Sequence, residues 1–89
     1  MSDRDERVIP NPLREGDYLV YADAEKLPSG GWAGFYRIDL HPEGQPLGKT
    51  VIPRKIFGNE VYMSEDIARV FAISYGQNFV RSTLVLTKD

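Results

Sequence analysis

The sequence predicts a small α+β domain: an antiparallel sheet of three strands, joined by a fourth at the C-terminus, with one amphipathic helix packed on one face. Three observations indicate this β-β-β-α-β order. Short apolar segments with strand-like alternation come first, turn-forming residues separate them, and a helical repeat of apolar residues follows. A chain of 89 residues has room for one core.

An N-terminal arm precedes the predicted domain. Residues 1–12 mix charges without apolar periodicity and end in two prolines, which favour extended backbone over helix. We therefore predict a flexible or extended arm over residues 1–12 and a single domain over residues 13–89. Alternatively, the arm docks on a neighbouring subunit through Val8 and Ile9.

The first two predicted strands form a hairpin. Residues 17–24 carry apolar side chains on both faces, and residues 27–31 then supply a proline and two glycines, a composition suited to a tight reversal. Residues 32–40 form the second strand, whose even-numbered side chains are expected to face the core. Gly34 in its middle indicates a bulge or the close approach of another backbone or ring.

A third strand, over residues 49–57, follows a loop rich in turn formers. Pro53 cannot donate a ladder hydrogen bond, so we place this strand at an edge of the sheet or expect a bulge at the proline. The last segment, residues 79–86, is predicted as a fourth strand because it is rich in β-branched residues. The alternative is that this segment extends the preceding helix.

Ser64 is the predicted N-cap of the helix, with Glu65 and Asp66 in the first turn, where the helix dipole favours acids. Gly76 is the predicted C-terminal stop. Between them, residues spaced by three and four form the apolar stripe that is expected to pack on the sheet: Ile67, Val70, Phe71, Ser74 and Tyr75.

One helix shields only one face of the sheet. On the other face, aromatic side chains such as Tyr21 and Phe35 are expected to form an apolar patch. Either this face is wet with scattered aromatic residues, or two copies share an exposed sheet or helix surface. We predict the homodimer.

The chain holds few groups suited to catalysis. It has no cysteine, which excludes disulfides and thiolate metal sites, and His41 is its only histidine, which excludes a two-histidine zinc site within one chain. Ser29 and Ser64 lack the glycine pattern of a nucleophile elbow, and residues 29–31 lack the Gly-Lys-Ser/Thr ending of a phosphate loop. We predict no enzyme activity and no cofactor, although a dimer would bring two copies of His41.

The net charge of −2 argues against the broad positive field that non-specific nucleic-acid binding requires. Residues 44–59, however, contain no acid, and their cations can form a basic strand near aromatic rings. The competing explanation is that edge strands carry lysine and arginine to prevent aggregation. The candidate binding residues are Arg37, Lys49, Arg54, Lys55, Tyr21 and Phe35.

These observations predict a non-catalytic interaction module whose partner is a second copy or another protein. A nucleic-acid-binding accessory domain that uses the basic strand is the alternative. The N-terminus lacks an apolar signal segment, and no run approaches the roughly twenty apolar residues that span a bilayer, so we predict a cytoplasmic protein without membrane contact. No family motif is recognised in the sequence.

Overall fold

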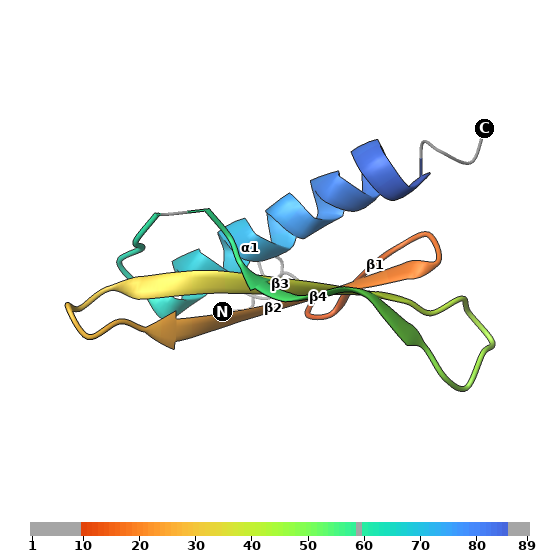
Figure 1. The fold of residues 1–89 in the computed structure, drawn as a ribbon, viewed down its shortest axis with the longest axis horizontal. Coiled ribbons are helices and arrows are strands. Elements are labelled where there is room, and N and C mark those ends of the chain that lie inside the picture. Colours follow the sequence, from red (N-terminus) through yellow and green to blue (C-terminus); the bar gives the residue numbers. More distant parts are fainter. Residues whose placement is uncertain (1–9, 59, 86–89) are drawn as a thin grey trace, which may run out of the picture.

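Antiparallel strands form a single sheet in the computed structural model, which describes residues 10–58 and 60–85 (Figure 1). The strands lie side by side in the order in which they follow along the chain, β1-β2-β3-β4. Residues 1–9 of the predicted N-terminal arm lie outside the described residues. The four strands are β1 (Leu13–Glu15), β2 (Tyr18–Lys26), β3 (Trp32–Leu40) and β4 (Lys49–Ile56).

The predicted β-β-β-α-β order is wrong, because the helix follows all four strands. Helix α1 (Glu65–Phe79) continues directly into a short π-helical segment, η2 (Val80–Val85), where a C-terminal strand was predicted. Residue 86 of that predicted strand lies outside the described residues. Val80 is fully buried in the core, so helix packing overrides the strand preference of this β-branched segment.

Gly76 does not end the helix as predicted. It lies within α1 and is buried against the sheet, where an added Cβ atom would collide with the side chain of Val20. The glycine therefore serves close packing between helix and strand instead of a left-handed helix end.

The strand that was not predicted from the sequence is β1, which lies at the edge of the sheet next to β2. It forms a hairpin with β2 through Gly16, which adopts a positive φ of 64°. Upstream of β1, the side-chain amide of Asn11 accepts a hydrogen bond from the Ala22 nitrogen at 3.0 Å and donates one to the Ala22 oxygen at 2.8 Å. Asn11 thus continues the pairing along the edge of β2.

The expectations for β3 and β4 are confirmed. Strand β3 has the predicted bounds, and Tyr36 and Ile38 on its even-numbered face are buried. Strand β4 is an edge strand, and its register shifts around Pro53: Tyr36 pairs with Lys55, whereas Ile38 pairs with Ile52. The proline therefore lies at a bulge on an edge strand, where its missing N–H is tolerated.

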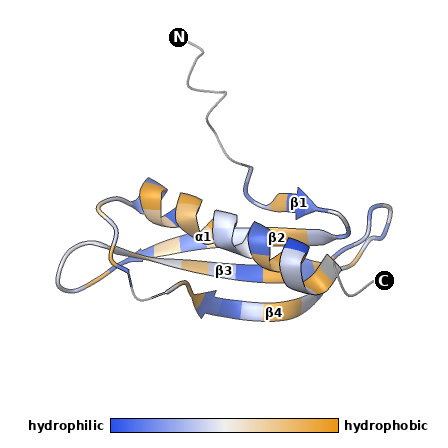
Figure 2. Ribbon diagram, turned by 90° about the horizontal axis from the view of Figure 1, so that it is seen from above, coloured by the Kyte–Doolittle hydropathy of each residue, from blue (hydrophilic) through white to orange (hydrophobic). Residues whose placement is uncertain are grey.

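Helix α1 crosses one face of the sheet and leaves the other face bare (Figures 1 and 2). Its start is as predicted: the Ser64 hydroxyl accepts a hydrogen bond from the Ile67 nitrogen at 3.2 Å. Apart from Ile73, the α1 residues that face the sheet are small. A Cβ atom added at Gly34 would lie 2.7 Å from the carbonyl oxygen of Ala68 and 3.3 Å from the Cβ atom of Ala72. The close backbone approach predicted at Gly34 is thus confirmed.

The core lies between α1 and the two central strands, with η2 at one end. Figure 2 shows the helix lying over these strands, with hydrophobic residues along its first turns. The buried cluster consists of Val20, Tyr36, Ile38, Ala72, Ile73 and Val80.

Polar contacts fasten β1 to the helical end of the chain. Glu15 accepts hydrogen bonds from Nε2 of Gln77 at 3.0 Å and from Nε of Arg81 at 2.8 Å. These contacts, that of Arg81 first, hold the pKa of Glu15 below its ordinary value. Ionised Glu15 therefore stabilises the folded state.

Replacing Glu15 with glutamine is expected to lower the free energy of unfolding at pH 7 by at most about 1 kcal/mol, because the ion pair is partly exposed. Since the folded state lowers the pKa of Glu15, its contribution is present above the ordinary value of 4.5 and is lost as the pH falls through the folded pKa. Urea unfolding from pH 7 to pH 3 should show the wild type and Glu15→Gln converging. A difference that stays constant over this range would contradict the assignment, and Glu60→Gln, at an exposed position before α1, is the control.

Candidate interaction surfaces

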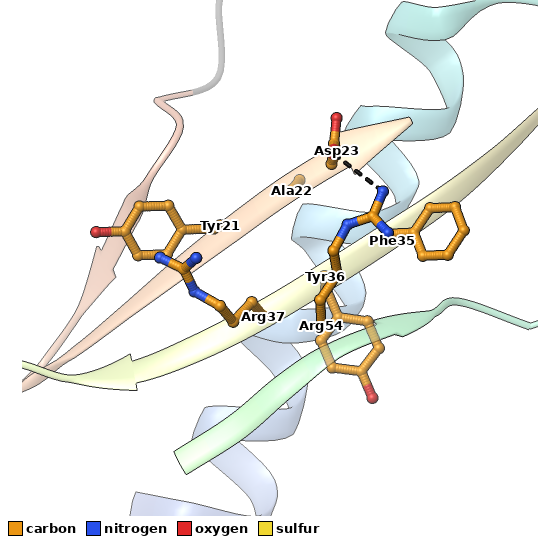
Figure 3. Close-up of a pocket in the computed structure, with 7 residues that line it drawn as sticks. All are labelled: Tyr21, Ala22, Asp23, Phe35, Tyr36, Arg37 and Arg54. Carbon is orange, nitrogen blue, oxygen red and sulfur yellow. Dashed lines mark hydrogen bonds and ion pairs between the residues drawn. The ribbon is translucent and has the colours of Figure 1, made fainter. Parts of the chain in front are cut away.

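The face of the sheet opposite α1 brings together four of the six candidate binding residues (Figure 3). Tyr21 and Phe35 lie there, and an arginine covers each ring. The Cζ atom of Arg37 is 4.0 Å from the centroid of the Tyr21 ring, and that of Arg54 is 4.0 Å from the centroid of the Phe35 ring. Tyr21 and Arg37 are direct cross-strand partners, which explains the first contact.

Carboxylates balance both of these arginines. Nη2 of Arg54 donates to Asp23 at 3.0 Å and to Glu25 at 2.7 Å, and the hydrogen bond with Glu25 is the main cause of a raised Arg54 pKa. Arg37 forms an ion pair with Asp39, with 3.2 Å between Nε and Oδ1. Two cations thus lie among three carboxylates, so this part of the sheet is not a basic surface.

The expected apolar patch on this face is covered by the chain's own arginines. Tyr21 and Phe35 are both half-buried, and a shallow pocket of about 210 Å³ lies between the two arginine–ring pairs. The guanidinium groups shield the rings from water and present polar edges to solvent. This arrangement removes the main reason for a second sheet to pack here.

The two remaining candidate residues lie elsewhere. Lys49 and Lys55 are exposed near opposite ends of β4, where they pair with Leu40 and Tyr36 of β3. Neither lysine lines the pocket that holds Arg37 and the other three candidates. The four cations therefore do not form one continuous basic strand.

Two of the groups considered for catalysis, His41 and Ser64, have structural contacts, as does the carboxylate of Asp39. The His41 ring bonds the Gln45 carbonyl oxygen at 2.9 Å, which closes the loop after β3. Ser64 caps α1, and Asp39 accepts a hydrogen bond from the Thr50 hydroxyl at 2.9 Å. Within residues 10–58 and 60–85, no three histidine or acidic side chains are grouped as metal ligands would be.

A row of partly exposed apolar side chains lies on the side of α1 that its apolar periodicity predicts to be buried. That expectation is wrong: the helix packs on the sheet through Ala68, Ala72, Ile73 and Gly76, and its other large apolar residues are about half-exposed. We call this surface the α1 stripe; it consists of Ile67, Val70, Phe71, Ser74 and Tyr75. The exposed fractions of its apolar side chains are 41% for Ile67, 40% for Val70, 50% for Phe71 and 43% for Tyr75.

Rings from outside α1 support one side of the α1 stripe. Phe71 stacks on Tyr62 with 5.2 Å between ring centroids, and Tyr75 lies 5.0 Å from Phe57 and 5.2 Å from Tyr36. Burial raises the pKa values of Tyr36 and Tyr62, so both rings are neutral at physiological pH. These contacts fix the orientation of two stripe residues while leaving part of each ring exposed.

The sequence contains a signal for this orientation of the helix. Ala68, Ala72 and Gly76 recur at a spacing of four and so form one row along the helix. A row of small residues lets a helix backbone approach a partner closely, provided that the partner also lacks a side chain, as Gly34 does. Pairing these two features would have predicted the buried side of α1.

No protein-family model matches the chain, and no match is found among curated proteins or solved structures. Within the part of the chain that the structure describes, no helix combines the length and the apolar character needed to cross a membrane.

Proposed function

We propose that this domain is a non-catalytic interaction module that acts as a homodimer, with the α1 stripe as its contact surface. The observation that carries the proposal is the exposure of four large apolar side chains along one helix, each by 40% or more. Monomeric soluble proteins rarely expose contiguous apolar surface of this kind, and burial of such a surface stabilises a complex.

A second copy fits this surface because a two-fold dimer places the same surface of each subunit in contact. The α1 stripe is uncharged along its length, so it can pack on itself without burying an unpaired charge. The segment that leads into α1 adds to the apolar surface, since Val61 is 58% exposed and Met63 is 88% exposed. The bare sheet face is less suitable, because charged side chains cover its rings.

Nucleic acid remains the alternative partner, but the geometry supports it less well. Arg37 and Arg54 are paired with carboxylates, which leaves Lys49 and Lys55 as the cations for phosphate contacts. Salt-sensitive binding of an oligonucleotide pool that weakens in Lys49→Ala and Lys55→Ala would favour this alternative.

We further propose that the domain needs no cofactor and resides in the cytoplasm. The single histidine supports the first part, since its ring is bonded to the loop that follows β3. The lack of cysteine supports a cytoplasmic location, because small domains in oxidising compartments typically contain disulfide bonds.

Replacing Val70 with glutamate is expected to convert the dimer to a monomer. A carboxylate in the centre of an apolar contact loses hydration without gaining a partner, and we expect the dissociation constant to rise at least about 100-fold. Light scattering coupled to size exclusion, over a wide range of protein concentrations, measures this change. Circular dichroism should show an intact fold, because Val70 is 40% exposed in the single chain.

Leu47→Glu is the matched control, since Leu47 is 82% exposed but lies in the loop between β3 and β4. This variant should dimerise as the wild type does. A wild type that remains monomeric throughout, or a Val70→Glu variant that dimerises normally, would overturn the proposal.

A further inference from the structure

Opposite charges lie at the two ends of the α1 stripe. Asp66 is in the first turn of α1, and 90% of its side chain is exposed. Arg81 is in η2, about four helical turns further along, and 58% of its side chain is exposed. Fifteen residues of α-helix advance by four turns and about 60°, so both charges lie toward the same exposed side of the helix, with Asp66 next to the start of the α1 stripe and Arg81 beyond its end.

Both side chains retain capacity for another partner. Asp66 contacts Arg69 at 3.5 Å, at the weak limit for a hydrogen bond, and Arg69 also bonds Glu65. Arg81 donates to Glu15 through Nε at 2.8 Å. A guanidinium group has five N–H donors, so the terminal nitrogens of Arg81 can bond a second carboxylate.

A two-fold axis that pairs Asp66 of one copy with Arg81 of the other passes midway between these positions. The midpoint falls at Ile73 and Ser74. Ile73 is only 3% exposed, so Ser74 is the residue that lies at the axis on the solvent side. Its small side chain permits the interaxial distance of about 8–10 Å at which helices pack.

The antiparallel pairing also matches the aromatic residues. It places Phe71 of one copy near Tyr75 of the other, where rings can add to the apolar contact. A parallel pairing would instead place Asp66 beside Asp66 and Arg81 beside Arg81, and would align the two helix dipoles. Charge complementarity thus selects the antiparallel arrangement.

We infer that two copies of this chain pair through antiparallel α1 helices, with Ser74 at the two-fold axis and Asp66 and Arg81 setting the orientation. The inference rests on the homodimer proposed above. It adds the geometry of the contact and two charged residues outside the α1 stripe that determine it.

Site-directed cross-linking tests this geometry, because the chain contains no cysteine and each introduced thiol is unique. Single variants Ser74→Cys, Asp66→Cys and Arg81→Cys are treated with a short thiol-specific bismaleimide, alone and mixed in pairs after subunit exchange. Ser74→Cys should cross-link to itself, and the mixture of Asp66→Cys with Arg81→Cys should give a cross-linked heterodimer. Asp66→Cys alone should not cross-link, since the two Asp66 positions lie about 22 Å apart along antiparallel helices.

Lys49→Cys, on the exposed edge strand, is the control for random collision and should not cross-link. Self-cross-linking of Asp66→Cys without the mixed product would indicate parallel helices and overturn the inference. A wild type that is dimeric by light scattering but yields no cross-link at the three helix positions would also overturn it, while the homodimer itself would stand. A strictly monomeric wild type would overturn the proposed function as well.

Discussion

Replacing Gly34 with valine is expected to lower the free energy of unfolding by about 3 kcal/mol or more, a large share of the roughly 5–15 kcal/mol that stabilises a typical domain. The Cβ atom alone would lie 2.7 Å from the carbonyl oxygen of Ala68. That oxygen belongs to the α1 backbone, which cannot move without separating the helix from the sheet. Urea unfolding monitored by the fluorescence of Trp32 measures the loss.

Whether Gly34→Val destabilises or stabilises the domain shows whether α1 packs on β3. Valine is preferred over glycine in strands, so the same substitution would stabilise β3 if α1 did not cover it. Gly34→Ala should give a smaller loss, about 1–3 kcal/mol, because only the Cβ atom must be accommodated. Lys49→Val, which introduces valine at an exposed strand position, should change the stability by less than about 0.5 kcal/mol. A Gly34→Val variant at least as stable as the wild type would contradict the packing of α1 on β3.

Replacing Ala72 with leucine is expected to destabilise the domain by about 2–3 kcal/mol, with a fall in Tm of about 10 °C or more. Ala72 is fully buried, and an added Cβ atom at Gly34 would already lie 3.3 Å from its Cβ atom. The larger side chain therefore has no space between helix and sheet. Thermal unfolding followed by circular dichroism, at concentrations where each variant is monomeric, gives the measurement.

Val70→Ala is the matched variant on the opposite side of α1. Because Val70 is 40% exposed and alanine has the higher helix propensity, this change should be neutral or slightly stabilising in the monomer. The conventional assignment of the large apolar residues to the core predicts the reverse order, with Val70→Ala more harmful than Ala72→Leu. The pair therefore distinguishes the two orientations of the helix without knowledge of any partner.

Features that depend on neighbouring residues could be predicted from the sequence. The bounds of β3, the N-cap at Ser64 and the edge position of Pro53 all follow from turn chemistry, capping and the missing proline N–H. The fourth strand could not be predicted in this way. Strand β1 has three residues, too few for a periodic signal, and it depends on pairing with β2 and on contacts of Glu15 with the C-terminal helix.

The same distinction between local and tertiary features applies to the candidate surfaces. Of the six candidate residues taken from the sequence, Tyr21, Phe35, Arg37 and Arg54 lie on one face of the sheet, whereas Lys49 and Lys55 lie elsewhere. The sequence did not show that Asp23 and Glu25 of β2 would pair with Arg54 of β4, because these partners come from different strands. Charge balance on a sheet face depends on strand order and register, which composition along one strand does not contain.

The sequence by itself determined that an amphipathic helix begins after Ser64, since periodicity, capping and first-turn acids all act within the segment, although it did not determine where the helix ends. Only the tertiary structure decided which side of that helix is buried. Gly34 and Ala68 lie far apart in the chain, and their contact lets a row of small residues approach the sheet more closely than large side chains could. Close packing of small residues thus left the apolar residues of the α1 stripe partly exposed, and this exposure is the basis of the proposed function.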